Sequence, residues 1–240
     1  MEIKGRVIIV TGGVGNLGGA IVKTLEAEGA IVIVLDLQKV NKLNYYAVDL
    51  CNERKVVEII EIIIEKYKKI DVLINNAGVI YSEPLVNILN PLQRRHSYES
   101  FSKYVTLNLD TTFITGSIVA EQMVLKRTKG LIINMSSISA VGNAGQSAYS
   151  AAKAGVEALT RTWSKELGVF GIRSIAISPG FINTNSTSLA LNESMIKYIK
   201  KNTPLRSLGE VENISDTILF AIKNDYLNGE VVNVNGGLTI

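Results

Sequence analysis

The residues near the N-terminus constrain the fold more than any other stretch of the chain. A short apolar run at 6–10 is followed at once by TGGVGNLGG and then by a helical pattern that Gly29 ends. A strand, a glycine turn and a helix in this order place backbone N–H groups and a helix N-terminus where they can bind a pyrophosphate. The sequence therefore predicts an α/β fold that binds a nucleotide.

Six further apolar runs continue the alternation of strands and helices. The predicted strands are 31–35, 45–48, 72–74, 131–133, 174–177 and 230–234, and the predicted helices after the first are 53–69, 97–125, 147–167, 193–202 and 213–223. No break in composition marks a second domain. We therefore expect residues 1–240 to form one Rossmann-like domain, a doubly wound parallel sheet of about seven strands with helices on both faces. The polar segment 183–205 is interpreted as a cap over the substrate.

Composition excludes several classes of protein. Hydrophobic residues make up 47% of the 240 residues, yet no apolar run approaches the ~18 residues of a membrane span. The net charge of +3 comes with short lysine clusters typical of solvated helix ends, so no nucleic-acid partner is expected. Cys51 and His96 are single, which excludes an internal disulfide and argues against a metal site. No signal peptide is recognised, and we expect a cytoplasmic protein.

Tyr149 and Lys153 lie four residues apart in the stretch SAYSAAKAG. If the helix begins near Ser147, this spacing puts the phenol and the ammonium on one face, one turn apart. A nearby cation favours the phenolate, so we expect the pKa of Tyr149 to fall from about 10 towards the working pH. Such a tyrosine can pass a proton to or from a substrate oxygen. Taken alone, the pair also fits a solvent-exposed helix face.

The order of the motifs is more specific than any one of them. TGGVGNLG, NNAG, Asn108, a serine pair before Tyr-x-x-x-Lys, and PGFINT follow one another along the chain. In this order the sequence resembles the short-chain dehydrogenase/reductase family over essentially its whole length. The usual cofactor turn of that family is TGxxxGxG, and Asn16 replaces its central glycine. Asn tolerates unusual backbone angles better than most residues, so we expect the turn to be retained.

The resemblance implies a binding role for each matched position. The phosphate turn would be Gly12, Asn16, Leu17 and Gly18; the adenine pocket Asp49 and Leu50; the floor under the ribose and nicotinamide Asn75, Ala77 and Gly78; and the flank of the carboxamide Pro179, Ile182 and Thr184.

Asp36, which ends the second predicted strand, bears on the choice of cofactor. At this distance from the glycine turn an acidic residue can accept both hydroxyls of the adenosine ribose and would repel a 2′-phosphate. Leu37 and Gln38 supply no cation to reverse that preference. The sequence therefore favours NAD(H) over NADP(H), with a simple turn residue as the alternative interpretation of Asp36.

The resemblance also implies the catalytic residues. Tyr149 would be the acid/base, Lys153 would lower its pKa and hold the nicotinamide ribose, and Asn108 would help to hold a water in a proton relay. A serine would polarise the substrate oxygen: counting forward from Asn134 selects Ser137, and counting back thirteen residues from Tyr149 selects Ser136. Because a loop absorbs a deletion more easily than a strand changes register, we choose Ser137 and interpret Ser136 as a turn or capping residue.

The substrate is less constrained than the chemistry. The segment 78–108 and the ending NDYLNGEVVNVNGG look like the 3-hydroxyacyl-CoA dehydrogenase branch, and the Tyr/Lys region looks like 3-oxoacyl-carrier-protein reductases. Both branches act on a 3-hydroxyacyl or 3-oxoacyl thioester. Sugar and simple secondary-alcohol dehydrogenases share the same core. Two other classes remain as alternatives: a non-catalytic nucleotide-binding regulatory protein, and an epimerase or dehydratase with bound NAD.

A homotetramer or homodimer is the expected assembly. The helix predicted at 97–125 is apolar on more than one side, and the helix after Tyr149 is rich in small residues, which allow close packing between subunits. These small residues are Ala151, Ala152, Ala154, Gly155 and Ala158. The alternative is that they only let the helix lie close to its own sheet.

Overall fold

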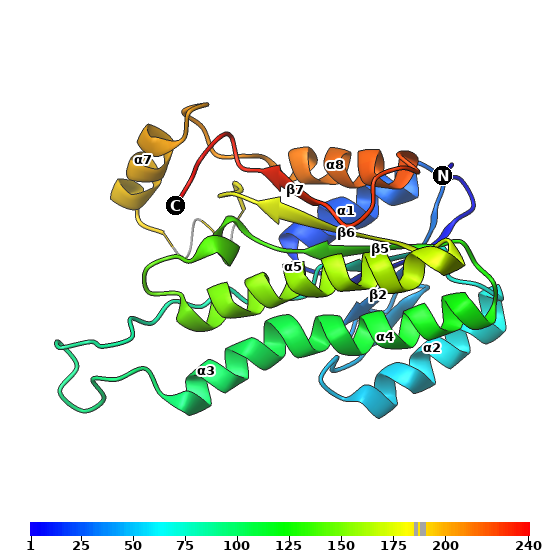
Figure 1. Cartoon of the computed structure of the whole chain (residues 1–240), viewed down its shortest axis with the longest axis horizontal. Helices are drawn as coiled ribbons and strands as arrows, with labels where there is room; N and C mark the ends of the chain where they lie inside the picture. Colours follow the sequence, from blue (N-terminus) through cyan, green and yellow to red (C-terminus); the bar gives the residue numbers. More distant parts are fainter. Residues whose placement is uncertain (185–186, 188–190) are drawn as a thin grey trace.

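A computed structural model describes residues 1–184, 187 and 191–240, and it shows a parallel sheet with helices on both faces (Figure 1). The sheet has seven strands in the order β3-β2-β1-β4-β5-β6-β7. They are β1 (Val7–Thr11), β2 (Ile31–Asp36), β3 (Tyr45–Ala47), β4 (Val72–Asn75), β5 (Leu131–Met135), β6 (Arg173–Pro179) and β7 (Val231–Val234). The predicted fold class is confirmed, and each predicted strand is found with its ends within two residues.

The central strands form because their β-branched side chains are buried on both faces. In β1 all five residues are buried, and successive side chains enter different cores. Ile8 and Val10 pack with the helices of one face, whereas Val7 and Ile9 pack with those of the other. This continuous apolar run is why β1 is readable from the sequence.

In the part of the chain that the structure describes, two helices pack on one face of the sheet and three on the other (Figure 1). The first pair is α1 (Asn16–Ala27) and α8 (Val211–Lys223), and the second group is α2 (Glu53–Tyr67), α4 (Thr111–Leu125) and α5 (Ser147–Leu167). No helix within the described residues is long and apolar enough to cross a membrane.

The strand order reverses between β1 and β4, so a crevice is expected at the carboxyl edge of the sheet there. From β1 the chain proceeds to β2 and β3 on one side, and from β4 it proceeds to β5, β6 and β7 on the other. Ligands of open α/β sheets bind where the order reverses in this way. The glycine turn follows β1 and the NNAG segment follows β4, so the two motifs meet at that crevice.

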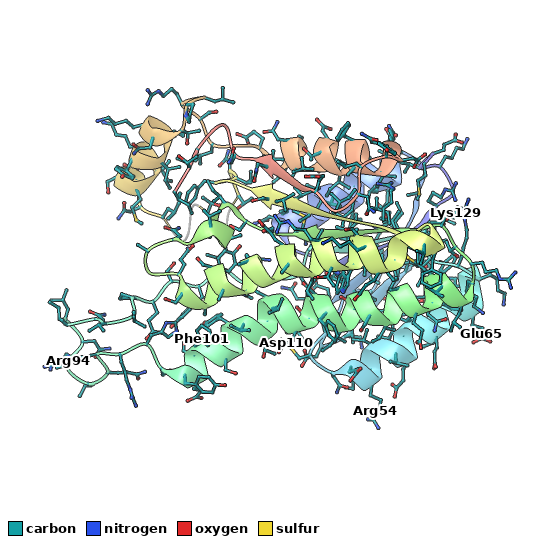
Figure 2. All side chains as sticks on the ribbon, viewed as in Figure 1. Arg54, Glu65, Arg94, Phe101, Asp110 and Lys129 are labelled. Atoms are coloured by element: carbon teal, nitrogen blue, oxygen red, sulfur yellow. The ribbon has the colours of Figure 1, made fainter. Side chains whose placement is uncertain are left out.

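Three segments surround this edge. The predicted helix 97–125 is found as α3 (Tyr98–Val105), a π-helical turn (Thr106–Asp110) and α4. The loop between β4 and α3 projects from the body, with Arg94 far out along it and Phe101 on α3 (Figure 2). Helix α7 (Glu193–Asn202) lies at the same end of the molecule (Figure 1). Part of the predicted cap, residues 185–186 and 188–190, lies outside the described residues.

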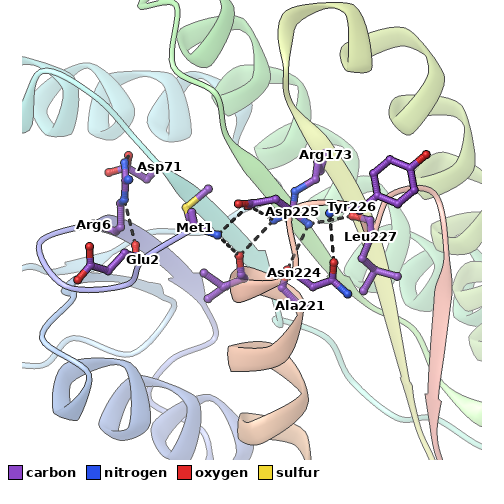
Figure 3. A network of polar contacts seen from close by, with 11 residues as sticks. Met1, Glu2, Arg6, Asp71, Arg173, Ala221, Asn224, Asp225, Tyr226 and Leu227 are labelled. Atoms are coloured by element: carbon purple, nitrogen blue, oxygen red, sulfur yellow. Dashed lines mark hydrogen bonds and ion pairs between the residues drawn. The ribbon is translucent and has the colours of Figure 1, made fainter.

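The opposite end of the sheet is held by a polar network (Figure 3). The guanidinium of Arg173 donates to the carbonyl oxygens of Ala221 (3.2 Å) and Leu227 (2.8 Å). The α-amino group of Met1 pairs with the carboxylate of Asp225 at 2.7 Å. Cations at the C-terminal end of α8 are favoured by the helix dipole. This network is therefore structural and lies away from the crevice.

Candidate active site

At the glycine turn, the backbone of Gly12 lies in direct contact with Ala77 on one side and with Gly18 on the other. Gly12 has a φ of 65°, and a Cβ there would lie 2.9 Å from the Cα of Ala77. A Cβ on Gly18 would lie 2.1 Å from the carbonyl oxygen of Gly12. Helix α1 begins after Gly15 without a side-chain cap, so the N–H groups of its first turn are available to an anion. The geometry fits the phosphates of a dinucleotide.

Asn16, which replaces the usual glycine, is the first residue of α1 and is exposed. The expectation that it tolerates unusual backbone angles is not needed, because Asn16 has no positive φ and the left-handed residue of the turn is Gly12. The substitution therefore leaves the turn unstrained.

The two asparagines of NNAG have different surroundings. Asn75 is buried; its amide donates to Oδ1 of Asn134 (2.9 Å), and its Oδ1 accepts from the hydroxyl of Thr115 (2.6 Å). Its side chain thus joins strands and helix inside the core, and the expectation that Asn75 is part of a floor under the ribose stays a prediction. Asn76, which sequence reasoning missed, donates to the carbonyl oxygens of Thr11 (3.0 Å) and Gly12 (3.2 Å) and so holds the glycine turn.

Thr11 is a second residue that the sequence reasoning missed. Its hydroxyl oxygen accepts from the backbone N–H groups of Asn76 and Ala77, both at 3.0 Å. The signal was its place as the last residue of β1 immediately before the glycines. Thr11 thereby fixes Ala77 and Gly78 against the crevice.

Asp36 ends β2 beside the turn. Its carboxylate accepts from the backbone N–H groups of Val14 and Gln38, each at 3.0 Å. Each carboxylate oxygen keeps a lone pair, so two ribose hydroxyls can still be accepted. The carboxylate of Asp49 accepts from the N–H of Cys51 (3.0 Å) after β3, and the neighbouring Leu50 is buried.

Asn108 is fully buried in the π-helical turn between α3 and α4. Its Oδ1 accepts from the N–H of Val79 (3.0 Å), and its amide donates to the carbonyl oxygens of Val79 and Tyr104 (both 2.9 Å). Single π-helical turns of this kind are frequent at functional sites. A Cβ on Gly78 would lie 2.7 Å from Oδ1 of Asn108 and 3.4 Å from Nζ of Lys153, so this glycine brings the two side chains close together.

Lys153 is buried in α5, and its ammonium donates to the carbonyl oxygen of Met135 at 2.8 Å. Burial lowers the pKa of Lys153 to about 8. The ammonium lies 5.6 Å from the centre of the Tyr149 ring, so the predicted one-turn spacing on one helix face is confirmed.

The expected direction of the Tyr149 pKa is not found. Burial raises the pKa of Tyr149, and the neighbouring Ser137 side chain offsets only part of that increase. The reason is that the phenol is almost wholly enclosed, so desolvation of the phenolate outweighs its neighbours.

The two serines have separate partners. Ser137 is the neighbour that lowers the pKa of Tyr149, and its Oγ accepts from the N–H of Ser139 (3.2 Å) at the start of the 3₁₀ turn Ile138–Val141. Ser136 is buried and donates to Oε1 of Glu157 at 2.9 Å. The capping contact therefore belongs to Ser137, although the sequence assigned it to Ser136.

The remaining predicted residues follow β6. Pro179 ends the strand, Ile182 is buried and pairs with Gly209 in an isolated bridge, and the hydroxyl of Thr184 hydrogen-bonds that of Thr187 at 3.0 Å. Ile199 of α7 is in one apolar cluster with Ile138, next to Ser137. Helix α7, which lies within the segment expected to form a cap, is thus attached to the serine loop.

A doubly wound parallel sheet, a glycine turn at its switch point and a buried Tyr–Lys pair beside it define a dinucleotide-binding protein of the Rossmann type. Among the described residues no group of His, Cys, Asp and Glu side chains could hold a metal ion. The family model described as enoyl-(acyl carrier protein) reductase matches residues 13–239.

Relatives match over the whole chain. A 3-oxoacyl-[acyl-carrier-protein] reductase of Thermotoga maritima is 33% identical, covering 100% of both chains. Sorbitol-6-phosphate 2-dehydrogenase of Klebsiella pneumoniae is 32% identical, covering 100% of this chain and 98% of the relative. Bovine 3-hydroxyacyl-CoA dehydrogenase type-2 is 30% identical, covering 99% and 96%. The structure of NAD⁺-bound xylitol dehydrogenase has a TM-score of 0.87 at 24% identity, covering 99% of this chain and 100% of the other.

The chain therefore belongs to the short-chain dehydrogenase/reductase family. The family model that matches it is the one described as enoyl-(acyl carrier protein) reductase. It is an oxidoreductase that acts on CH–OH groups with a nicotinamide cofactor. The expected resemblance, fold and reaction class are confirmed.

Proposed function

We propose that this chain is a single-domain, cytoplasmic, NAD(H)-dependent oxidoreductase that interconverts a secondary alcohol and a ketone, with Tyr149 as the acid/base. The observation that carries the proposal is the arrangement around Tyr149. Ser137 lies close enough to the phenol to lower the pKa of Tyr149, and the Lys153 ammonium lies one helical turn away, 5.6 Å from the centre of the ring. A hydroxyl donor and an acid/base side by side can bind one substrate oxygen together.

The roles of the side chains follow from their positions. Tyr149 gives its proton to the substrate oxygen in reduction and takes it back in oxidation, while the hydroxyl of Ser137 donates to the same oxygen. Lys153 stabilises the phenolate electrostatically and has N–H donors left for ribose hydroxyls. Asn108 accepts from the N–H of Val79, next to Gly78, and would fix the backbone along which a proton relay could run beside Lys153. The bound nicotinamide supplies or accepts the hydride.

The residues at the crevice fit the cofactor. Gly12 and Gly18 let the backbone approach the phosphates, with Asn16 and Leu17 in the first turn of α1. Asp36 would accept the adenosine ribose hydroxyls, and its negative charge disfavours a 2′-phosphate. We therefore propose NAD(H) as the preferred cofactor. A kcat/KM that favours NADPH over NADH would contradict this preference.

The remaining binding roles are proposed from position. Asp49 and Leu50 follow β3 and would flank the adenine, and Ala77 and Gly78 follow β4 and would lie under the nicotinamide ribose. The carboxamide would lie beside the segment after β6, which contains Pro179, Ile182 and Thr184.

The proposed substrate is a 3-hydroxyacyl or 3-oxoacyl thioester. Two relatives named for such chemistry, one bacterial and one bovine, match this chain from end to end. A sugar or secondary alcohol is the second candidate, because sorbitol-6-phosphate 2-dehydrogenase is almost as similar. The purified protein should be assayed with NAD against thioesters, sugar phosphates, sugar alcohols and simple secondary alcohols.

The decisive experiment replaces Tyr149 with Phe. This substitution removes the hydroxyl and keeps the ring, so turnover should fall by at least about 1000-fold while NADH still binds. Lys153→Ala should lose turnover and weaken NADH binding as well. Full activity of Tyr149→Phe would refute the acid/base role.

We also propose a homotetramer or homodimer. The small residues of α5 divide into two groups: Gly155 packs on Leu109 of the same chain, where a Cβ would lie 2.9 Å from Cδ2, whereas Ala151, Ala154 and Ala158 are exposed. Phe113 of α4 is also half exposed. Light scattering should give at least twice the monomer mass of 26.1 kDa, and a monomer would refute the proposal.

A further inference from the structure

We propose that Glu157 of α5 is a positioning residue: its carboxylate holds Ser136, and this contact presents the adjacent Ser137 to Tyr149. The role depends on the function proposed above for Tyr149. Glu157 itself does not reach the reacting oxygen and acts through the serine loop.

A series of side-chain hydrogen bonds joins β5 to α5. The amide of Asn134 donates to the hydroxyl of Thr160 at 2.9 Å, and two residues further along the chain Ser136 donates to Oε1 of Glu157 at 2.9 Å. Alternate residues of a strand point to one face, and residues three apart in a helix lie on one side. The strand and the helix are thus aligned by matched pairs, and the Ser136 contact is the last pair on that face.

Ser137 lies just beyond this contact. Its backbone is extended, with φ −163° and ψ 152°, so its side chain points away from the face that Ser136 occupies. Met135, the residue before the two serines, is held as well, because Lys153 donates to its carbonyl oxygen. The direction of the Ser137 hydroxyl therefore depends on how firmly Ser136 is held against α5.

Burial makes the contact between the two side chains important. Ser136 is 4% exposed, and its N–H donates to the carbonyl oxygen of Ile177 at 2.7 Å. A buried hydroxyl that loses its acceptor is unfavourable, so removal of the carboxylate should turn the serine and shift the loop. The other oxygen of Glu157 accepts from Arg161 at 3.2 Å, towards solvent.

The test compares Glu157→Leu with Glu157→Gln. Leu removes the acceptor, so kcat should fall about tenfold while the dissociation constant for NADH changes less than about twofold. Gln keeps an oxygen that can accept from Ser136, and it should retain at least about half of the wild-type kcat. Arg161→Ala is the matched control, because it breaks only the outer contact and should leave kcat unchanged.

A double variant tests whether the pair acts as a unit. Ser136→Ala should lower kcat, and Ser136→Ala combined with Glu157→Leu should be no worse than Glu157→Leu alone. Additive losses would overturn the proposal, as would equal losses in the Gln and Leu variants or an Arg161→Ala variant as impaired as Glu157→Leu. Thermal unfolding of each variant identifies one that has failed to fold. If Glu157→Leu does not fold, the kcat of Glu157→Gln decides whether the proposal holds.

Crystal structures separate this proposal from the proposed function. In Glu157→Leu the hydroxyl of Ser137 should turn away from the phenol of Tyr149, and in Glu157→Gln it should stay beside the phenol. If the wild-type enzyme turns over no substrate of the panel, the proposed function fails but this structural comparison still applies. A Ser137 that stays on Tyr149 in Glu157→Leu refutes the positioning role.

Discussion

The buried ammonium of Lys153 leads to a prediction about folding that does not depend on the substrate. Burial lowers the pKa of Lys153 from 10.5 to about 8, whereas the unfolded chain keeps the ordinary value. Between these two pH values the unfolded state binds more protons, so the free energy of unfolding rises with pH. Well below pH 8 both states carry the charge, and its burial costs about 3 kcal/mol at roughly 1.4 kcal/mol per pH unit.

The perturbation is Lys153→Met, which removes the titrating group and keeps an unbranched side chain. From pH 7 to pH 9.5 the free energy of unfolding of the wild type should rise by about 2 kcal/mol relative to that of Lys153→Met. All other titrating groups are shared by the two proteins. Both apo proteins should be unfolded with urea at the two pH values and at one protein concentration. The difference between their free energies of unfolding should show this change.

The pH range ends at 9.5 because burial raises the pKa of Tyr149, which places its titration above that range. Lys165→Met is the matched control, since Lys165 lies exposed on the same helix. Its difference from the wild type should change by less than about 0.5 kcal/mol. If the difference between wild type and Lys153→Met stays constant from pH 7 to pH 9.5, burial does not lower the pKa of Lys153 and the prediction is wrong.

Two further predictions concern glycines at which a side chain would collide with neighbouring atoms. Gly18→Ala puts a Cβ 2.1 Å from a carbonyl oxygen and should lower the free energy of unfolding by about 1–3 kcal/mol and weaken NADH binding at least tenfold, as measured by urea unfolding and calorimetry. Gly19→Ala, whose Cβ would have its nearest contact at 3.8 Å, should be neutral or stabilising. Gly116→Ala puts a Cβ 2.4 Å from the ring of Trp163, so it should destabilise by about 1–3 kcal/mol and change the fluorescence of this single tryptophan. Ser117→Ala, at an exposed position, should change neither, and a glycine variant as stable as its control would contradict the predicted steric clash at that glycine.

The sheet could be predicted because buried parallel strands are continuous apolar runs. The predicted strands stopped too early where polar residues follow, as at Ile74 and Ile133. In the structure Asn75 and Asn134 continue their strands, pair in register and hydrogen-bond each other. A polar residue ends an apolar run in the sequence, but it stays in the strand when a neighbouring strand supplies its partner.

The relative position of Tyr149 and Lys153 could be predicted, but the environments of these side chains could not. The spacing of Tyr149 and Lys153 is local, so it follows from helix geometry alone. The directions of their pKa shifts depend on burial by other elements, and no local pattern shows how much water is excluded. The partner of Ser136 is similarly distant, because Glu157 lies 21 residues further along the chain.

Burial of Lys153 links the stability of the fold to its chemistry. An apolar side chain at this position would spare the protein the cost of burying a charge, and a solvent-exposed lysine would carry the charge without that cost. Neither would leave a desolvated cation one turn from a buried phenol. Because both groups are enclosed, the electrostatic effect of the ammonium on any phenolate that forms is screened less than it would be in water. A lysine whose burial destabilises the apo protein is thus the residue whose charge the proposed acid/base needs, as expected where local stability and function conflict.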